Sequence, residues 1–303
     1  MSNFLIPEPD KVLSVGMEDG ATIILRQYGE TSKSRIILSH GNGFAIDGYV
    51  PYWALLLADF EVVIFDFRNY GRNPVHDGEH DYKRFYSDMG LLYEAIRREF
   101  GTKPQAGVFH SMSARVNLNL ALKGHRHVDG MIVFDPPMVP IQGHPLRQCL
   151  MNEEELLWRW SAGRPESFED PSELAATFAK SRMLSGWVEG AYERMARSVL
   201  REDPDAGLWR LVCSPSRESH IYRQNADLNI WPFAHELPFP VLLVGGDPET
   251  HRPSAPSFAC QALGKERGWR YEYVPDTNHF AQLQKPEACI KLTHEFLSEI
   301  DLF

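Results

Sequence analysis

The sequence of 303 residues is poor in basic charge and contains no long apolar run. Its 31 Lys and Arg residues are outnumbered by 41 Asp and Glu residues, which gives a formal net charge of −10 at pH 7. Because nucleic-acid binding needs a clustered Lys/Arg surface, this balance argues against a nucleic-acid partner. Runs of about 18 apolar residues are absent, so no membrane span is expected. The N-terminal sequence also lacks the pattern of a signal peptide, and we expect a cytoplasmic protein.

Sequence patterns for metal and cofactor binding are also missing. The four cysteines Cys149, Cys213, Cys260 and Cys289 form no C-x-x-C pair, which argues against a zinc site or a disulfide framework. The segment HDGEHD (76–81) has two histidines and three carboxylates, but a glycine interrupts it and no further ligand is evident. No G-x-G-x-x-G motif follows a predicted strand, so dinucleotide binding has no support. We therefore expect neither a metal nor another cofactor.

What the chain does contain is an alternation of short apolar runs and longer segments of helical period. Strands are predicted at 23–28, 35–40, 61–67, 106–110, 130–137, 240–246 and 269–275, and helices at 49–59, 82–100, 113–124 and 287–300. Continuous Val, Ile and Leu runs separated by helices are typical of a parallel sheet covered on both faces. The predicted fold class is α/β.

Residues 138–237 break this alternation. The segment has helical stretches rich in tryptophan and charge, no convincing strand, and proline-rich stretches at both ends. We interpret it as a helical cap (lid) inserted into a core domain made of residues 1–137 and 238–303; the alternative is that it enlarges the core. Its five tryptophans line either the interior of the cap or a hydrophobic acyl pocket.

The stretch GVFHSMSARV (107–116) places Ser111 where a predicted strand turns directly into a helix. Ligands of parallel sheets bind at the carboxyl ends of the strands, so this serine is expected at the ligand crevice. The pattern is that of a nucleophile elbow, usually G-x-S-x-G, whose small residues permit a strained turn. Ser113 and Ala114 fit this need, whereas Phe109 stands where glycine is usual. Taken alone, the motif equally allows a buried structural serine.

Four other segments follow a known order around this serine. They read HGNGF (40–44), DFRNYGRN (66–73), VLLVGGDPETHRP (241–253) and VPDTNHFAQLQKP (274–286). Together they resemble the α/β-hydrolase family, and in particular its serine hydrolases and esterases, although two asparagines depart from the family pattern D-x-R-G-x-G-x-S. The resemblance implies the α/β-hydrolase fold, a mostly parallel central sheet flanked by helices, with the helical cap after the sixth strand.

A serine hydroxyl needs a base to accept its proton during nucleophilic attack. Histidine can accept and return a proton near neutral pH. The resemblance gives this role to His279, which follows a predicted strand in a loop that can reach across the top of the sheet. The nucleophile and base are therefore expected to be Ser111 and His279.

The carboxylate that orients the histidine has three candidates. Alignment of Gly246 and Pro253 with the family's glycine and proline puts Glu249 at the acid position. Asp247 is the second candidate, two residues nearer the strand. Asp135 is the third, because the sixth strand also opens toward the site.

The resemblance also implies an oxyanion hole. The backbone N–H of Met112, which follows the nucleophile, supplies one donor. The second is expected from Asn42, in a loop that Gly41 and Gly43 allow to bend close to the substrate.

These residues imply a serine hydrolase that cleaves a carboxylic ester or lactone of a small organic substrate through an acyl-enzyme. The same geometry also serves hydrolysis of a carbon–carbon bond in a vinylogous diketone, of an amide or of a thioester. A different class, a ligand-binding protein on the hydrolase scaffold, is kept as an alternative because Phe109 and Glu249 depart from the family pattern. The expected partner is a small ester-like molecule.

Overall fold

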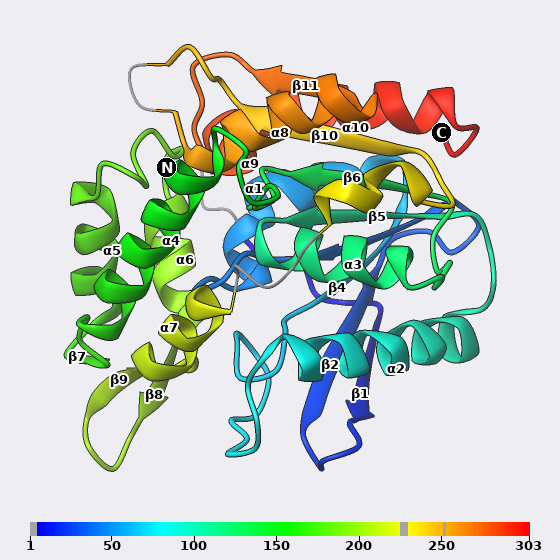
Figure 1. Ribbon diagram of the computed structural model, residues 1–303. Coiled ribbons are helices and arrows are strands. Elements are labelled where there is room, and N and C mark those ends of the chain that lie inside the picture. Colours follow the sequence, from blue (N-terminus) through cyan, green and yellow to red (C-terminus); the bar gives the residue numbers. More distant parts are fainter. Residues whose placement is uncertain (1–4, 225–229, 251–252) are drawn as a thin grey trace.

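An eight-stranded sheet forms the centre of the protein, with strand order β1-β2-β4-β3-β5-β6-β10-β11 (Figure 1). The computed structural model describes residues 5–224, 230–250 and 253–303. The strands of this sheet are β1 (Lys11–Gly16), β2 (Thr22–Tyr28), β3 (Arg35–Ser39), β4 (Glu61–Phe65), β5 (Gln105–His110), β6 (Gly130–Phe134), β10 (Val241–Gly246) and β11 (Arg270–Val274). Strand β2 is antiparallel to β1 and β4, and the other neighbouring pairs are parallel. The predicted α/β class with a mostly parallel sheet is confirmed.

The central strands consist of residues that are buried on both faces of the sheet. Every residue of β3, β4, β6 and β10 is buried, as expected for parallel strands covered by helices on both sides. All seven predicted strands are present with ends within three residues of the prediction. Strand β1 was not predicted, because Val15 is its single buried residue and an edge strand of this kind carries little apolar pattern.

Helices cover both faces of the sheet. The core helices are η1 (Ile46–Tyr49), α1 (Val50–Trp53), η2 (Ala54–Ala58), α2 (Tyr82–Phe100), α3 (Met112–Leu122), α8 (Ala255–Arg267), α9 (Ala281–Gln284) and α10 (Pro286–Glu299). Side chains of α2, α3 and α8 share one hydrophobic core with one face of the sheet. Side chains of η1, α1 and α10 share a second core with the other face. The sheet is thus the middle layer of three.

Helix α2 has the bounds that the sequence predicts. The Asp81 side chain accepts a hydrogen bond from the Arg84 backbone N–H and caps its first turn. The face toward the sheet includes the buried residues Phe85, Met89, Leu92 and Ile96. Gly101, at φ 78°, follows the last turn in a conformation that glycine adopts without strain. Asp81 belongs to the segment HDGEHD, so part of that segment serves as a helix cap.

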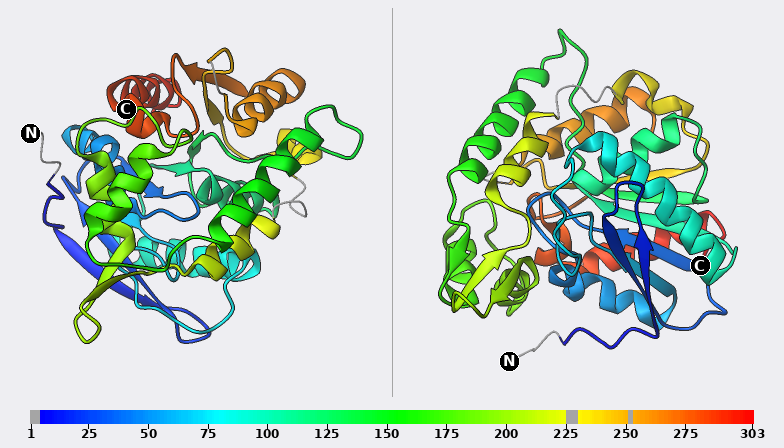
Figure 2. Two further views of the ribbon diagram at one scale, coloured as in Figure 1. Left: turned by 90° about the vertical axis from the view of Figure 1, so that its left-hand side faces the viewer. Right: turned by 90° about the horizontal axis from the view of Figure 1, so that it is seen from below.

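Most of the chain between β6 and β10 forms a separate group of elements to one side of the sheet (left in Figure 1, and again at one side in the right view of Figure 2). Its elements are α4 (Arg147–Ala162), β7 (Ser167–Phe168), α5 (Pro171–Lys180), α6 (Ala191–Val199), β8 (Leu200–Asp203), β9 (Leu208–Leu211) and α7 (Pro215–Arg223). The short helix η4 (Trp231–Glu236), which precedes β10, instead packs on α3 and α8 of the core (Figure 1). The expectation of no strand here was wrong, since β7, β9 and β8 form a small antiparallel sheet. These strands are only two to four residues long, too short for a clear alternating pattern. We call this segment the cap; its exact domain boundaries stay a prediction.

Candidate functional site

Ser111 lies at the sharp turn between β5 and α3. Its backbone has φ 52° and ψ −112°, a conformation rarely adopted by a residue with a side chain. The turn is held from both sides, because the Ser111 N–H donates to the Phe134 carbonyl at 2.9 Å and its carbonyl accepts from the Arg115 N–H at 3.1 Å. Strain of this kind persists where the surroundings over-determine the backbone and is frequent at functional sites.

Phe109 departs from the usual elbow, and the structure explains how it is accommodated. A Cβ atom on Gly107 would lie 2.3 Å from the Phe109 ring, so the ring occupies the space left by a glycine two residues earlier on the strand. After the turn, the Ser113 hydroxyl accepts from the His110 N–H at 3.0 Å and lies 3.1 Å from the Ser39 carbonyl. The need for a small residue is therefore met by Gly107 and Ser113.

His279 contacts a carboxylate, and that carboxylate is Asp135. The distance from His279 Nδ1 to Asp135 Oδ2 is 2.6 Å. Burial disfavours the charged imidazolium, but the hydrogen bond and charge of Asp135 outweigh burial and raise the pKa of His279 above its ordinary value. Because Nδ1 is engaged by the carboxylate, Nε2 is the ring nitrogen left to serve a second group.

Asp135 immediately follows β6 and is 2 % exposed. The Ser254 hydroxyl donates to Oδ2 at 2.6 Å and the Ser257 hydroxyl donates to Oδ1 at 2.9 Å. Its backbone has φ 43°, so Asp135, like Ser111, has a positive φ directly after a strand. The carboxylate is thus fully engaged by the imidazole and two hydroxyls.

The other two acid candidates lie in the loop after β10 and have different surroundings. Glu249 is exposed, and its backbone N–H donates to Asp247 Oδ1 at 2.8 Å. Asp247 Oδ2 accepts from the Asp276 N–H at 2.9 Å, so this carboxylate ties together the loops that follow β10 and β11. Asp135, the third of the three candidates from the sequence, is therefore the one whose carboxylate contacts His279.

The predicted oxyanion donors flank Ser111. Met112 is the first residue of α3, and Asn42, 5 % exposed, lies in the loop after β3. Gly41 must be a glycine, because a Cβ there would lie 2.9 Å from the His110 ring and 3.2 Å from Ser111 Cβ. The loop can therefore approach Ser111 closely only because residue 41 is a glycine, which has no side chain.

Two buried histidines support these loops. His40 Nδ1 lies 2.8 Å from the Gly41 carbonyl, and its Nε2 accepts from the Phe67 N–H at 3.1 Å. His110 Nε2 lies 2.8 Å from the carbonyl of His279, which can only accept, so the proton of this ring is on Nε2. His110 Nδ1 then accepts from the Tyr49 hydroxyl at 2.7 Å. Burial and the nearby His279 hold the pKa of His110 well below its ordinary value, so this ring stays neutral.

A cavity of about 390 Å³ lies between the core and the cap and reaches the predicted nucleophile and base. Ser111, His279 and Asn42 line it together with cap residues of α4, α5 and α7. Apolar side chains in its wall are Phe44, Leu150, Leu156, Leu157, Trp160, Phe178, Met183, Leu184 and Phe280. Of the five tryptophans in residues 138–237, Trp160 lines this cavity, which supports the acyl-pocket interpretation for one of them. We call this space the inner cavity.

Glu153, on α4, is an acidic group in the wall of the inner cavity that sequence analysis missed. Its Oε2 accepts from the Ala255 N–H at 2.8 Å. Burial raises the pKa of Glu153 above its ordinary value, against the opposing effects of the Ala255 N–H and of His279. No sequence signal identifies it, because its place depends on how the cap folds back over the core.

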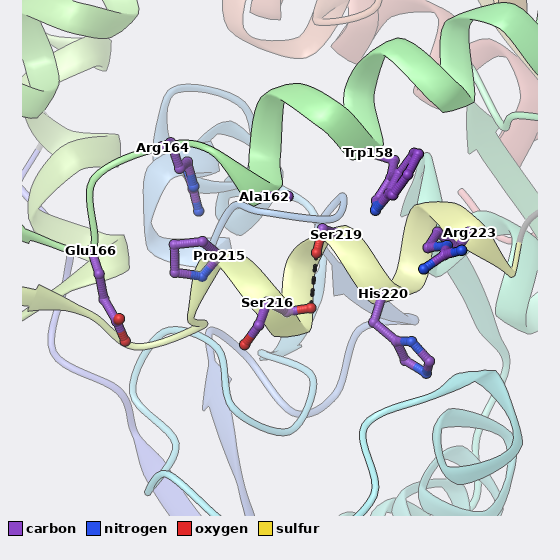
Figure 3. Close-up of a pocket in the computed structure, with 9 residues that line it drawn as sticks. All are labelled: Trp158, Ala162, Arg164, Glu166, Pro215, Ser216, Ser219, His220 and Arg223. Carbon is purple, nitrogen blue, oxygen red and sulfur yellow. Dashed lines mark hydrogen bonds between the residues drawn. The ribbon is translucent and has the colours of Figure 1, made fainter.

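A second hollow, of about 450 Å³, lies within the cap between α4 and α7 (Figure 3). Its wall contains Trp158, Ser216, Ser219, His220 and Arg223, but none of the predicted catalytic residues. Figure 3 shows Ser216 and Ser219 on one side of α7, with the Ser219 hydroxyl donating to the Ser216 carbonyl. We call this space the outer hollow.

Within residues 5–224, 230–250 and 253–303 there is no cluster of three His, Cys, Asp or Glu side chains suited to hold a metal ion. In the same described part of the chain, no helix has the length and apolar character needed to cross a bilayer.

Comparisons with known proteins agree with this architecture. A family model described as the alpha/beta hydrolase family matches residues 36–292. No significant match is found among curated proteins. Among solved structures, E-2-(acetamidomethylene)succinate hydrolase superposes with a TM-score of 0.75 at 21% identity, covering 95% of this chain and 100% of that one.

Two further solved structures are similar over nearly their whole length. The thioesterase domain from the curacin biosynthetic pathway has a TM-score of 0.70 at 16% identity, covering 94% of this chain and 99% of that chain. An esterase from Exiguobacterium antarcticum has a TM-score of 0.68 at 16% identity, with 96% and 100% covered. At these identities the likeness establishes the fold, and the predicted α/β-hydrolase fold is confirmed.

Proposed function

Because the chain belongs to the alpha/beta hydrolase family and is a hydrolase, we propose that it is a serine hydrolase that cleaves a carboxylic ester or lactone of a small organic molecule. The observation that carries this proposal is the 2.6 Å contact of His279 Nδ1 with Asp135, beside a cavity that His279 shares with Ser111. In this assignment Asp135 replaces Glu249 as the acid of the triad. The exposed position of Glu249 gives it no comparable support.

The proposed reaction begins with attack of the Ser111 hydroxyl on the substrate carbonyl, while His279 Nε2 takes the hydroxyl proton. Asp135 keeps the Nδ1–H tautomer and stabilises the imidazolium that forms. The backbone N–H groups of Asn42 and Met112 donate to the oxyanion; loss of one such donor typically costs about 10²- to 10³-fold in rate. His279 then protonates the leaving alcohol, and water hydrolyses the acyl-enzyme by the same steps.

The walls of the inner cavity suggest which substrates fit. A volume of about 390 Å³ and mainly aliphatic and aromatic walls favour a small ester or lactone with an apolar acyl or alcohol group. Hydrolysis of a thioester, an amide or a vinylogous diketone would use the same groups. We put the ester class first because the solved neighbours include an esterase, and the thioesterase domain keeps the thioester class as the next candidate. A binding protein without catalysis is the alternative that labelling must exclude.

Labelling with a fluorophosphonate followed by peptide mapping tests the proposal. We expect one covalent adduct on Ser111, no adduct in Ser111→Ala, and labelling slowed at least 100-fold in His279→Ala. Ser216→Ala, which removes an exposed serine of the outer hollow, is the matched control and should label like the wild type. Failure of the wild-type protein to label would favour the binding-protein alternative.

A panel of p-nitrophenyl esters, thioesters, anilides and short lactones then separates the bond types. We expect kcat/KM to be highest for short apolar esters or lactones. If anilides or thioesters are hydrolysed with a higher kcat/KM than the matched esters, the proposed substrate class is an amide or a thioester instead.

A further inference from the structure

The side chain of Asn42 joins the oxyanion loop to both the core and the cap. Tyr70, in the core, donates from its hydroxyl to Asn42 Oδ1 at 2.6 Å. Asn42 Nδ2 donates to the backbone carbonyl of Glu218, on α7 of the cap, at 3.0 Å. The orientation of the amide is fixed by chemistry, because a carbonyl can accept but not donate. This side chain is therefore fully occupied in holding its own loop.

The next residue of the loop packs directly on the carboxylate of Glu218. Gly43 has φ 80°, and a Cβ atom there would lie 2.5 Å from Glu218 Oε1. Glu218 is 2 % exposed and forms an ion pair with Arg164, whose side chain is 8 % exposed. Burial raises the pKa of Glu218 above its ordinary value, although Arg164 opposes this effect. A buried ion pair of the cap is thus pressed against the backbone of the oxyanion loop.

Helix α7 lies between the inner cavity and the outer hollow and contributes residues to both. Glu218 lines the inner cavity, whereas Ser216, Ser219 and His220 line the outer hollow (Figure 3). Arg164 lines both. The pair of Arg164 and Glu218 therefore lies where the cap, the oxyanion loop and the inner cavity meet.

We propose that Glu218 is a positioning residue for the oxyanion hole, so that the hole is complete only while the cap is seated on the core. Its backbone carbonyl fixes the Asn42 amide, and its carboxylate, held by Arg164, sets the path of the backbone at Gly43. The Asn42 N–H is thereby aimed into the inner cavity. This inference rests on the proposed serine-hydrolase function, and it makes the cap a part of the catalytic apparatus as well as a cover.

Replacement of Glu218 tests the positioning role. In Glu218→Ala the loop loses its packing partner and Arg164 loses its counter-charge; a misplacement of about 1 Å typically costs about 10²-fold in rate. We expect kcat/KM to fall by about that factor, with a parallel loss of affinity for a trifluoromethyl ketone, which binds as an oxyanion. KM for the ester should change less than kcat, because Glu218 is one residue of a mainly apolar cavity wall that is otherwise retained. The pH at which activity is half-maximal should change little, because the base is untouched.

Glu218→Gln and Glu166→Gln complete the test. Glu218→Gln keeps the size of the side chain, so it should fold and show a smaller loss of the same kind, about tenfold. Glu166, exposed at the outer hollow, is the matched control and should behave as the wild type. Unchanged trifluoromethyl ketone affinity in a folded Glu218 variant, with the wild type still labelled on Ser111, would overturn this inference alone. Absence of labelling in the wild type would instead remove the proposed function.

Discussion

Replacing Asp135 by asparagine tests the proposed acid of the triad, and the contacts of its carboxylate set the expected size of the effect. The groups that bind this carboxylate besides His279 are the hydroxyls of Ser254 and Ser257. A hydroxyl can turn and accept as well as donate, so a carboxamide can keep its oxygen toward His279 Nδ1 and its nitrogen toward Ser257. The variant therefore removes mainly the negative charge and leaves the geometry.

If Asp135 is the acid, we expect its charge to contribute about three orders of magnitude in rate. With 2.6 Å between His279 Nδ1 and Asp135 Oδ2, the centres of the two charges lie about 4 Å apart, which corresponds to about 4 kcal/mol at an effective dielectric constant near 20. Each 1.4 kcal/mol, roughly, is a tenfold change in rate. We expect kcat for a p-nitrophenyl ester to fall about 10³-fold in Asp135→Asn, with a near-native circular dichroism spectrum.

The matched controls are the two carboxylates of the loop after β10. Glu249→Gln removes an exposed charge and should change kcat less than about threefold. Asp247→Asn weakens a link between two loops and should cost up to about tenfold. A larger loss in Glu249→Gln than in Asp135→Asn would refute the assignment and restore Glu249 as the acid.

Three other predictions concern the proposed base, the loop after β3 and a buried ion pair of the core. The kcat/KM of the wild type should fall as the pH drops through the raised pKa of His279, because the protonated ring cannot act as a base. In Asp135→Asn this fall should occur at lower pH. A pH–rate profile of both proteins measures the shift, and a fall at the same pH in both would contradict the assignment of the raised pKa to Asp135. Gly43→Ala should lower both kcat and the free energy of unfolding, because φ is 80° and an added Cβ would collide with the carboxylate of Glu218. A variant with wild-type activity and an unchanged denaturant midpoint would contradict this close packing. Glu61→Leu removes one partner of a fully buried ion pair with Arg35, at the amino ends of β4 and β3, whereas the site lies at the carboxyl ends of the strands. It should lower the free energy of unfolding in urea by about 3–5 kcal/mol and leave kcat per labelled site unchanged. A loss of kcat without a loss of stability would contradict this prediction.

Much of the fold could be predicted because the signals are local. Buried parallel strands read as short runs of Val, Ile and Leu, and α2 shows one apolar face between Asp81 and Gly101. Helix α8 was not predicted, because its buried face consists largely of small residues such as Ala259, Cys260 and Gly264. The cap strands β7, β8 and β9 escaped prediction for another reason, since two to four residues do not establish a period.

The site could be predicted only in part. Ser111 and His279 each sit in a motif that fixes their place at a strand end, so the sequence indicates both. The acid differs, because β6 and β10 both end at the same edge of the sheet and each is followed by a carboxylate. Which of them meets His279 depends on the course of the backbone, including the positive φ of Asp135 and the hydroxyl of Ser254. Distances of this kind are set by tertiary structure and leave no pattern along the chain.

The hydrogen bonds of His110 link two loops that come from opposite ends of the chain. The Tyr49 hydroxyl accepts from the Gly41 N–H at 3.4 Å and donates to this ring, and the ring in turn holds the carbonyl of His279. We therefore expect a shift of the proposed oxyanion loop to reach, through one neutral imidazole, the loop that carries the proposed base. If Ser111 is the nucleophile, the residue just before it couples these two loops, and neither loop can be redesigned without regard to the other.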